Sequence, residues 1–125
     1  MRIALIEDAP GDVGWFRVVL AETLSSHNLF VFPSGGSALE HFEKNEPPEL
    51  IVSDWMLPGM EFPEFLKHVR AIPQCESTPV AVCSGLADYY SDKALKLGAV
   101  CCLQKPIDAV QLQTVFQRIG PSAQA

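Results

Sequence analysis

Short apolar segments recur along the chain, and most of them are followed directly by a charged or hydroxyl-bearing residue. Four of these segments cover residues 3–6, 50–53, 80–83 and 100–104, and a fifth apolar stretch covers 29–32. They are apolar almost throughout and rich in β-branched residues, which is typical of strands buried on both faces of a parallel sheet. The pattern therefore predicts a parallel sheet of five strands.

Between these segments, apolar residues recur with the spacing of an amphipathic helix. Residues at the segment ends support this interpretation, because Asp88 and Asp108 can cap helix N-termini and Gly98 can end a helix. Five helices are expected: from about Asp12 to Leu24, from 33–36 to before Pro47, around 62–69, from Asp88 to Leu97 and from Asp108 to Ile119.

The alternation of strand and helix predicts a three-layer α/β sandwich built from right-handed crossovers. Among the possible strand orders we choose 2-1-3-4-5. This order places the first and third strands side by side at a switch point, where ligands bind in such sheets. At 125 residues the chain fits one domain. We expect the domain to cover residues 1–120 and a frayed tail to cover 121–125.

Chemically active side chains follow four of the five predicted strands. In chain order they are Glu7 and Asp8, Asp54, Ser84, and Lys105. Because ligands of an open parallel sheet bind beyond the carboxyl ends of its strands, these side chains are expected to converge on a single pocket. That pocket would hold three carboxylates, one hydroxyl and one ammonium.

Three neighbouring carboxylates cannot all stay ionised unless a cation compensates them. No histidine lies at the predicted strand ends, and Cys83 is the one cysteine just inside such an end, so a soft metal is not expected. An all-oxygen site suits Mg²⁺ or Mn²⁺. Glu7 and Asp8 would hold the ion directly or through water. Asp54 would give one oxygen, and the carbonyl of Met56 another.

Asp54 is the candidate nucleophile, because it ends the central strand and points into the crevice. A carboxylate can attack a phosphoryl group to give an acyl phosphate. Such a transfer needs positioning and charge neutralisation more than bond-making help. The metal would supply one positive partner and Lys105 another. The Ser84 hydroxyl would bond a phosphoryl oxygen and so sense whether phosphate is present.

The overall charge narrows the range of partners. The formal net charge is −6, from 9 basic and 15 acidic residues, which disfavours direct nucleic-acid binding. No apolar run approaches the length of about 20 residues that crosses a bilayer. The first apolar run already ends at the charged residue Glu7, so we expect no secretory signal and no membrane partner, and cytoplasmic localisation.

The chain has four cysteines without Cys-x-x-Cys spacing, and we expect them to be buried, reduced thiols.

The combination of these motifs resembles the receiver domain of two-component response regulators. It comprises Glu7-Asp8, Asp54 followed by 56–59, Ser84-Gly85 and Lys105-Pro106, and the resemblance runs from Arg2 to about Ile119. It implies the CheY-like, flavodoxin-like fold. It also implies Mg²⁺ at the acidic cluster, a cis peptide before Pro106, and phosphorylation of Asp54 by a histidine kinase or phosphotransfer protein. Such a switch catalyses only its own phosphorylation and dephosphorylation and alters binding to a downstream protein or fused effector domain.

Two departures from the family pattern leave alternatives open. Cys102 stands where the family usually has an aromatic switch residue, and residues 61–62 replace a common Asp-Gly. A degenerate receiver that binds partners without phosphate is therefore one alternative, although the acidic cluster and Lys105 argue against it. An aspartyl-phosphate hydrolase is less favoured, because it needs a second acid where this chain has Met56.

Aromatic residues also lie close to the predicted site. Trp55 directly follows Asp54, and we expect it to pack over the rim of the pocket. Tyr89 and Tyr90 lie near the start of the fourth predicted helix. The sequence leaves open whether this pair packs internally or forms part of a partner surface.

Overall fold

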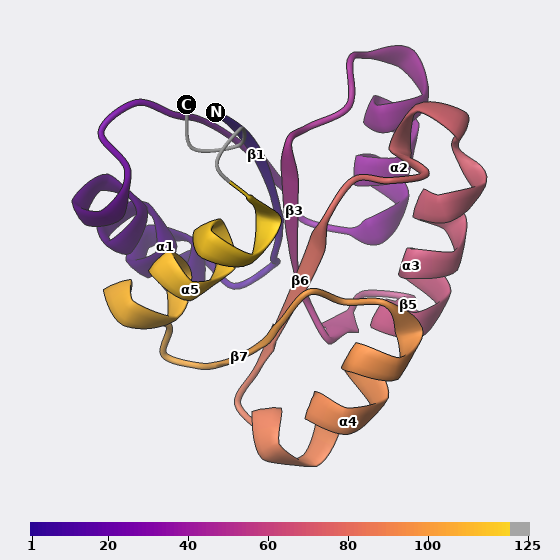
Figure 1. Cartoon of the computed structure of the whole chain (residues 1–125). Coiled ribbons are helices and arrows are strands. Elements are labelled where there is room, and N and C mark those ends of the chain that lie inside the picture. Colours follow the sequence, from indigo (N-terminus) through magenta and orange to yellow (C-terminus); the bar gives the residue numbers. More distant parts are fainter. Residues whose placement is uncertain (121–125) are drawn as a thin grey trace.

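The computed structural model describes residues 1–120 and contains a five-stranded parallel sheet with helices on both faces (Figure 1). The sheet consists of β1 (Arg2–Ile6), β2 (Asn28–Phe32), β3 (Leu50–Asp54), β6 (Val80–Ser84) and β7 (Cys102–Gln104). The strand order β2-β1-β3-β6-β7 is the predicted order 2-1-3-4-5. A short antiparallel hairpin of β4 (Met56–Leu57) and β5 (Met60–Glu61) follows β3. The predicted frayed tail, 121–125, lies outside the described residues.

Five α-helices form the two outer layers. They are α1 (Pro10–Thr23), α2 (Gly35–Lys44), α3 (Phe62–Ala71), α4 (Ala87–Leu97) and α5 (Ala109–Ile119), with a 3₁₀ turn, η1, at Pro73–Cys75. Helices α1 and α5 cover one face of the sheet, and α2, α3 and α4 cover the other (Figure 1). Within residues 1–120, every helix is too short or too polar to cross a membrane.

Each strand contributes alternate side chains to two separate cores. In β1, Ile3 and Leu5 pack towards α1 and α5, whereas Ala4 and Ile6 pack towards α2 and α3. The other central strands divide in the same way, because successive side chains of a strand point to opposite faces. Burial on both faces explains why the strands appear in the sequence as continuous apolar runs.

The first helix begins two residues before the predicted start at Asp12. Its first residue is Pro10, and Ala9 is the N-cap without a side-chain cap. Proline suits a first helical position because its φ is already fixed and its missing N–H is not needed there. Asp12 therefore lies inside the first turn of α1 with its carboxylate available for other contacts.

The predictions for the last two helices had mixed outcomes. Asp88 is not a cap, because α4 begins at Ala87 and its N-cap, Leu86, makes no side-chain cap bond. Gly98 ends α4 in the left-handed conformation with φ 108°, as predicted. Asp108 caps α5, and its Oδ1 accepts a hydrogen bond of 2.8 Å from the N–H of Gln111.

The placement of Trp55 at a pocket rim is wrong. Its side chain is 1% exposed and lies in the core between the sheet, α3 and α4. The indole stacks on Tyr90 with ring centroids 4.2 Å apart. Tyr89, in contrast, is 79% exposed. The two tyrosines therefore differ: Tyr90 packs against the core, and Tyr89 lies on the surface, where a partner could contact it.

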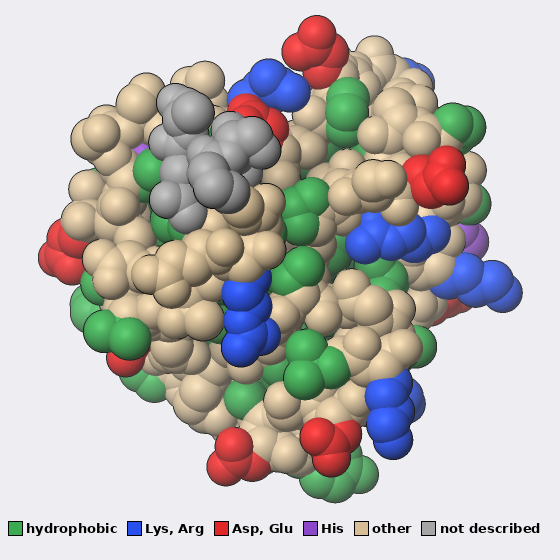
Figure 2. Space-filling view, viewed as in Figure 1, with side chains coloured by type: hydrophobic (Ala, Val, Ile, Leu, Met, Phe, Trp, Pro, Cys, Tyr) green, Lys and Arg blue, Asp and Glu red, His purple; other side chains and the backbone are tan. Residues whose placement is uncertain are grey.

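The cysteines form no disulfide within the described residues, and the surface charges form no dense patch on the face shown in Figure 2. All four cysteines are free; Cys75, Cys83 and Cys101 are buried and Cys102 is half-buried, in line with the expected reduced thiols. On the face seen in Figure 2, basic and acidic side chains are spread over the surface rather than gathered in one dense patch.

We expect the cap of α5 to contribute measurably to stability. Asp108→Ala should lower the free energy of unfolding by about 1 kcal/mol, because the Gln111 N–H loses its acceptor at a helix end. Asp88→Ala is the matched control, since Asp88 lies in a first turn without being a cap, and it should cost clearly less. Urea unfolding measures both values. Equal losses in the two variants would contradict the capping role.

Candidate functional site

The alternation of side chains along four strands brings the key residues to one face of the sheet. Glu7 continues the row of Ile3 and Leu5, and Asp54 the row of Leu50 and Val52, both of which pack towards α1 and α5. In the same way, Cys83 follows Ala81, and Lys105 follows Leu103. The registers of the pairs β1·β3, β3·β6 and β6·β7 align these strand ends. The four side chains therefore meet beyond the carboxyl edge, on the α1 side.

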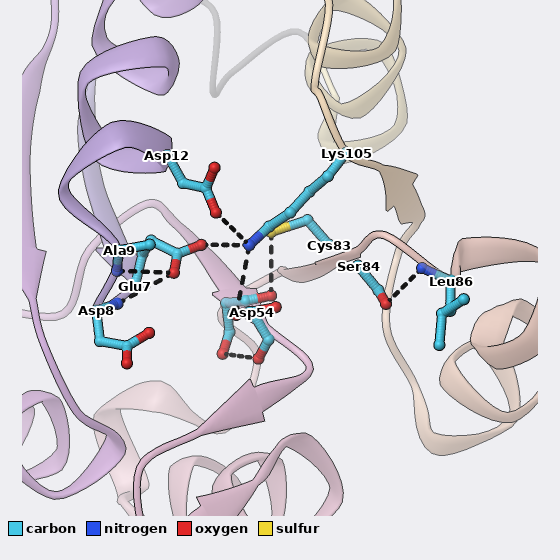
Figure 3. A network of polar contacts seen from close by, with 10 residues as sticks. Glu7, Asp8, Ala9, Asp12, Asp54, Cys83, Ser84, Leu86 and Lys105 are labelled. Carbon is cyan, nitrogen blue, oxygen red and sulfur yellow. Dashed lines mark hydrogen bonds and ion pairs between the residues drawn. The ribbon is translucent and has the colours of Figure 1, made fainter.

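The Lys105 ammonium is the centre of this cluster (Figure 3). Its Nζ lies 2.5 Å from Oε1 of Glu7, 2.9 Å from Oδ2 of Asp12 and 3.4 Å from Oδ2 of Asp54. The contacts to Glu7 and Asp12 are hydrogen bonds, and the contact to Asp54 is a longer ion pair. The shorter contacts are made with Glu7 and Asp12, not with the candidate nucleophile.

The Glu7 carboxylate is fixed by the turn that leads into α1. Its Oε2 accepts hydrogen bonds from the backbone N–H groups of Asp8 and Ala9, at 3.1 and 3.2 Å. Its Oε1 faces Lys105, and the whole residue is buried. Both oxygens of Glu7 are therefore already engaged in the structure (Figure 3).

Burial and charge shift the ionisation of this cluster in opposite directions. Burial raises the pKa of Asp54 and of Glu7, and the neighbouring Lys105 offsets part of each increase. Burial alone would lower the pKa of Lys105, but its hydrogen bonds to Glu7 and Asp12 outweigh that effect and raise it. Lys105 is thus a cation at neutral pH, and the clustered carboxylates still favour further positive charge.

The donor atoms of the cluster fit a hard cation. Glu7, Asp54 and Cys83 each offer one ligand atom, and these atoms lie within 4.8 Å of one another. Burial raises the pKa of the Cys83 thiol well above its usual range, so this sulfur keeps its proton and is a poor ligand. The two remaining donors are carboxylate oxygens, which suit Mg²⁺ or Mn²⁺.

Asp8 does not join this group. Its side chain is exposed, and its carboxylate points away from Lys105 (Figure 3). We expected Asp8 to lie beside Glu7 and Asp54, whereas the third carboxylate beside Lys105 in the structure is that of Asp12. Metal ligation by Asp8 and by the carbonyl of Met56 stays a prediction.

Ser84 lies on the other face of the sheet from Asp54, in the row of Val80 and Val82. It is buried, and its Oγ accepts a hydrogen bond of 2.9 Å from the N–H of Leu86 (Figure 3). The hydroxyl is thus tied to the start of the loop between β6 and α4. Any turn of Ser84 towards Asp54 must break that bond.

Gln104 is a residue that the sequence analysis did not identify. Its Nε2 donates to the carbonyl of Gly85 at 2.9 Å, and its Oε1 accepts from the N–H of Ala87 at 3.2 Å. Gln104 is paired with Ser84 in the sheet register, and that pairing is the signal that could have identified it. The loop after Ser84 is therefore clamped by the residue before Lys105.

Strand β7 and the segment after it carry two features that the sequence singled out, the peptide before Pro106 and the side chain of Cys102. The peptide between Lys105 and Pro106 is cis, as the resemblance implied. Cys102 is half-buried, with its Sγ 3.8 Å from the carbonyl oxygen of Ala87. A small thiol therefore occupies the position of the usual aromatic residue, next to the β6–α4 loop.

The cluster offers one chemical capability above others. Asp54 presents a carboxylate oxygen at the open edge of the sheet, beside a fixed ammonium and a second buried carboxylate that can share a cation. A nucleophilic oxygen flanked by positive charge is what transfer of an anionic phosphoryl group requires.

Comparison with known sequences identifies the family. The model for the response regulator receiver domain matches residues 3–117. The phosphate regulon transcriptional regulatory protein PhoB of Escherichia coli (strain K12) is 33% identical over 85 residues, which cover 63% of this chain and 37% of PhoB. This chain therefore corresponds to a minor part of that relative.

Solved structures give the same fold. The bacteriophytochrome response regulator RtBRR is 25% identical with a TM-score of 0.84, over 96% of this chain and 78% of that one. The receiver domain of the sensor histidine kinase PA1611 from Pseudomonas aeruginosa PAO1, which has a magnesium ion in its active site cleft, is 23% identical. Its TM-score is 0.82, over 96% of this chain and 98% of that one. With the family model spanning nearly the whole chain, the protein belongs to the response regulator receiver domain family.

Proposed function

We propose that the protein is a phosphoacceptor switch, in which Asp54 receives a phosphoryl group from a histidine kinase or a phosphotransfer protein. The observation that carries the proposal is the position of the Asp54 carboxylate, 3.4 Å from the Lys105 ammonium. Its half-buried setting beside Glu7 favours a bound cation as well. Family membership supports the same reading.

In the proposed step, an Oδ atom of Asp54 attacks the phosphorus of the donor. A phosphorus–oxygen bond forms as the bond to the donor's leaving atom breaks, and that atom departs with its electron pair. Asp54 reacts as a carboxylate, so no proton has to leave it. Lys105 neutralises charge on the transferred group, which is the main demand of such a transfer.

Glu7, Asp8, Asp54 and the carbonyl of Met56 would hold the Mg²⁺ or Mn²⁺ ion. When bound, the ion supplies the positive charge that lets an anionic donor approach a carboxylate cluster. The PA1611 receiver domain contains a magnesium ion in its active site cleft, which supports an equivalent ion here. Asp8 would have to turn its exposed side chain inwards to join the set.

Output would begin at Ser84. A phosphoryl oxygen on Asp54 would attract the Ser84 hydroxyl, which would then release the N–H of Leu86. The loop that follows is bonded to Gln104 and leads into α4, where Tyr89 is exposed. A changed surface there would alter binding to a downstream protein or a fused effector domain.

The two alternatives are less well supported. A degenerate receiver would not need the Asp54–Lys105–Glu7 arrangement. A hydrolase needs a second acid two residues after its nucleophile, whereas Met56 is a thioether with 56% of its surface exposed. We therefore propose that the protein catalyses only its own phosphorylation and dephosphorylation.

A small phosphodonor should label Asp54 alone. Wild-type protein incubated with acetyl phosphate and Mg²⁺ should gain one phosphoryl group by intact-mass analysis, and chelation of the metal should abolish the gain. Asp54→Asn should show no labelling, whereas Asp88→Asn, at an exposed position of α4 that is not an ion-pair partner of Lys105, should match the wild type. Equal labelling of wild type and Asp54→Asn would refute the assignment.

Stability should depend on pH through Asp54. The pKa of Asp54 is raised in the folded state, so its stabilising contribution is complete below its ordinary pKa of 3.8 and is lost as pH rises through the folded pKa. At neutral pH without metal, Asp54→Asn should therefore melt a few degrees above the wild type. The gap should close in acid, and millimolar Mg²⁺ should reduce it by stabilising the wild type. Asp88→Asn is the charge control. A lower Tm for Asp54→Asn at neutral pH would contradict the electrostatic account.

The output route should depend on Ser84 and not on Cys102. With beryllofluoride and Mg²⁺, Ser84→Ala should still bind the phosphoryl mimic but lose most of the change in amide exchange across residues 84–90. Cys102→Ala should keep that change, because its thiol is too small to act as a lever. A large loss in Cys102→Ala together with a normal response in Ser84→Ala would overturn this route.

A further inference from the structure

Helix α1 makes hydrogen bonds to the residues before and after Pro106. Two side chains on one face of the helix make these contacts. Asp12 Oδ2 accepts from the Lys105 ammonium at 2.9 Å. Trp15 Nε1 donates to the carbonyl oxygen of Ile107 at 2.5 Å. Residues three apart in a helix lie on the same face, so the two contacts together hold the segment that carries Lys105 against α1.

The Asp12 contact competes with the proposed acceptor for the same ammonium. Lys105 makes hydrogen bonds to Glu7 and Asp12, whereas Asp54 lies at the longer distance of 3.4 Å. Since the ammonium lies closer to Glu7 and Asp12 than to Asp54, its movement towards a phosphoryl oxygen on Asp54 has to lengthen one of those two shorter contacts.

Asp12 is the partner that is released most easily. Its side chain is 50% exposed, whereas those of Glu7 and Asp54 are 3% and 15% exposed. Water can rehydrate an exposed carboxylate, so loss of its ion pair costs little. Release of buried Glu7 would leave a carboxylate without its cation, which costs far more.

We propose that Asp12 is a positioning residue that holds Lys105 on the α1 side of the site until a phosphoryl group on Asp54 draws the ammonium across. Trp15 holds the backbone end of the same segment. The contact lowers the affinity of the site for a phosphoryl group by the cost of breaking it. This inference rests on the proposed phosphoacceptor function.

The test uses beryllofluoride with Mg²⁺ as the phosphoryl mimic, and ¹⁹F NMR to measure its affinity. Asp12→Asn should bind it about threefold more tightly than the wild type, the size expected for loss of a half-exposed ion pair. Asp12→Glu, which restores the carboxylate, should return towards wild-type affinity. Glu22→Gln removes one negative charge from the other end of α1 and should change the affinity little.

A double-mutant cycle separates positioning from simple charge repulsion. If Asp12 acts through Lys105, the tightening by Asp12→Asn should largely disappear in a Lys105→Gln background. An equal effect in both backgrounds would overturn the positioning role. Without any ligand, amide exchange over residues 105–108 should be faster in Asp12→Asn than in Glu22→Gln, and equal exchange would also count against it.

The outcomes also distinguish this inference from the function on which it rests. Wild-type protein that binds beryllofluoride, with unchanged affinity in Asp12→Asn, overturns the inference and leaves the proposed function in place. Wild-type protein that fails to bind it with Mg²⁺ overturns the proposed function, and the inference with it.

Discussion

The charge balance around the Lys105 ammonium is the interaction on which the site depends. One cation faces the carboxylates of Glu7, Asp12 and Asp54 within 3.4 Å, so the cluster carries excess negative charge in the absence of a second cation. Burial raises the pKa of Asp54 and of Glu7, and the hydrogen bonds to Glu7 and Asp12 raise the pKa of Lys105. The excess negative charge explains how the site can attract a divalent ion without histidine or thiolate ligands.

The sheet creates this balance by simple geometry. Parallel strands end at one edge, and alternation sends every second side chain to the α1 face. Glu7, Asp54 and Lys105 were therefore predictable from the residues that follow apolar runs, together with the strand order 2-1-3-4-5. The same alternation, applied residue by residue, would also have placed Trp55 in the opposite core, since it follows Asp54 directly. It would have set Asp8 apart from Glu7 for the same reason.

The remaining features depend on details that hydrophobic patterns do not encode. The start of α1 at Pro10 instead of Asp12 determines whether Asp12 is a cap or a residue of the first turn. Its contact with Lys105 joins residues 93 apart in sequence and depends on the rotation of α1 against the β7–α5 segment. The hydrogen bonds of Gln104 likewise depend on the conformation of the β6–α4 loop. Gly85 in that loop can adopt many backbone conformations, so the sequence alone does not predict which one it has.

The central claim is that Asp54 is the acceptor and that Lys105 moves to serve it. A crystal structure of the complex with Mg²⁺ and beryllofluoride tests this most directly. The account predicts beryllium bonded to an Oδ atom of Asp54, Lys105 Nζ within hydrogen-bonding distance of a fluorine, and the Lys105–Asp12 contact broken. Beryllofluoride bound elsewhere, or Lys105 still bonded to Asp12 with no contact to fluorine, would contradict it.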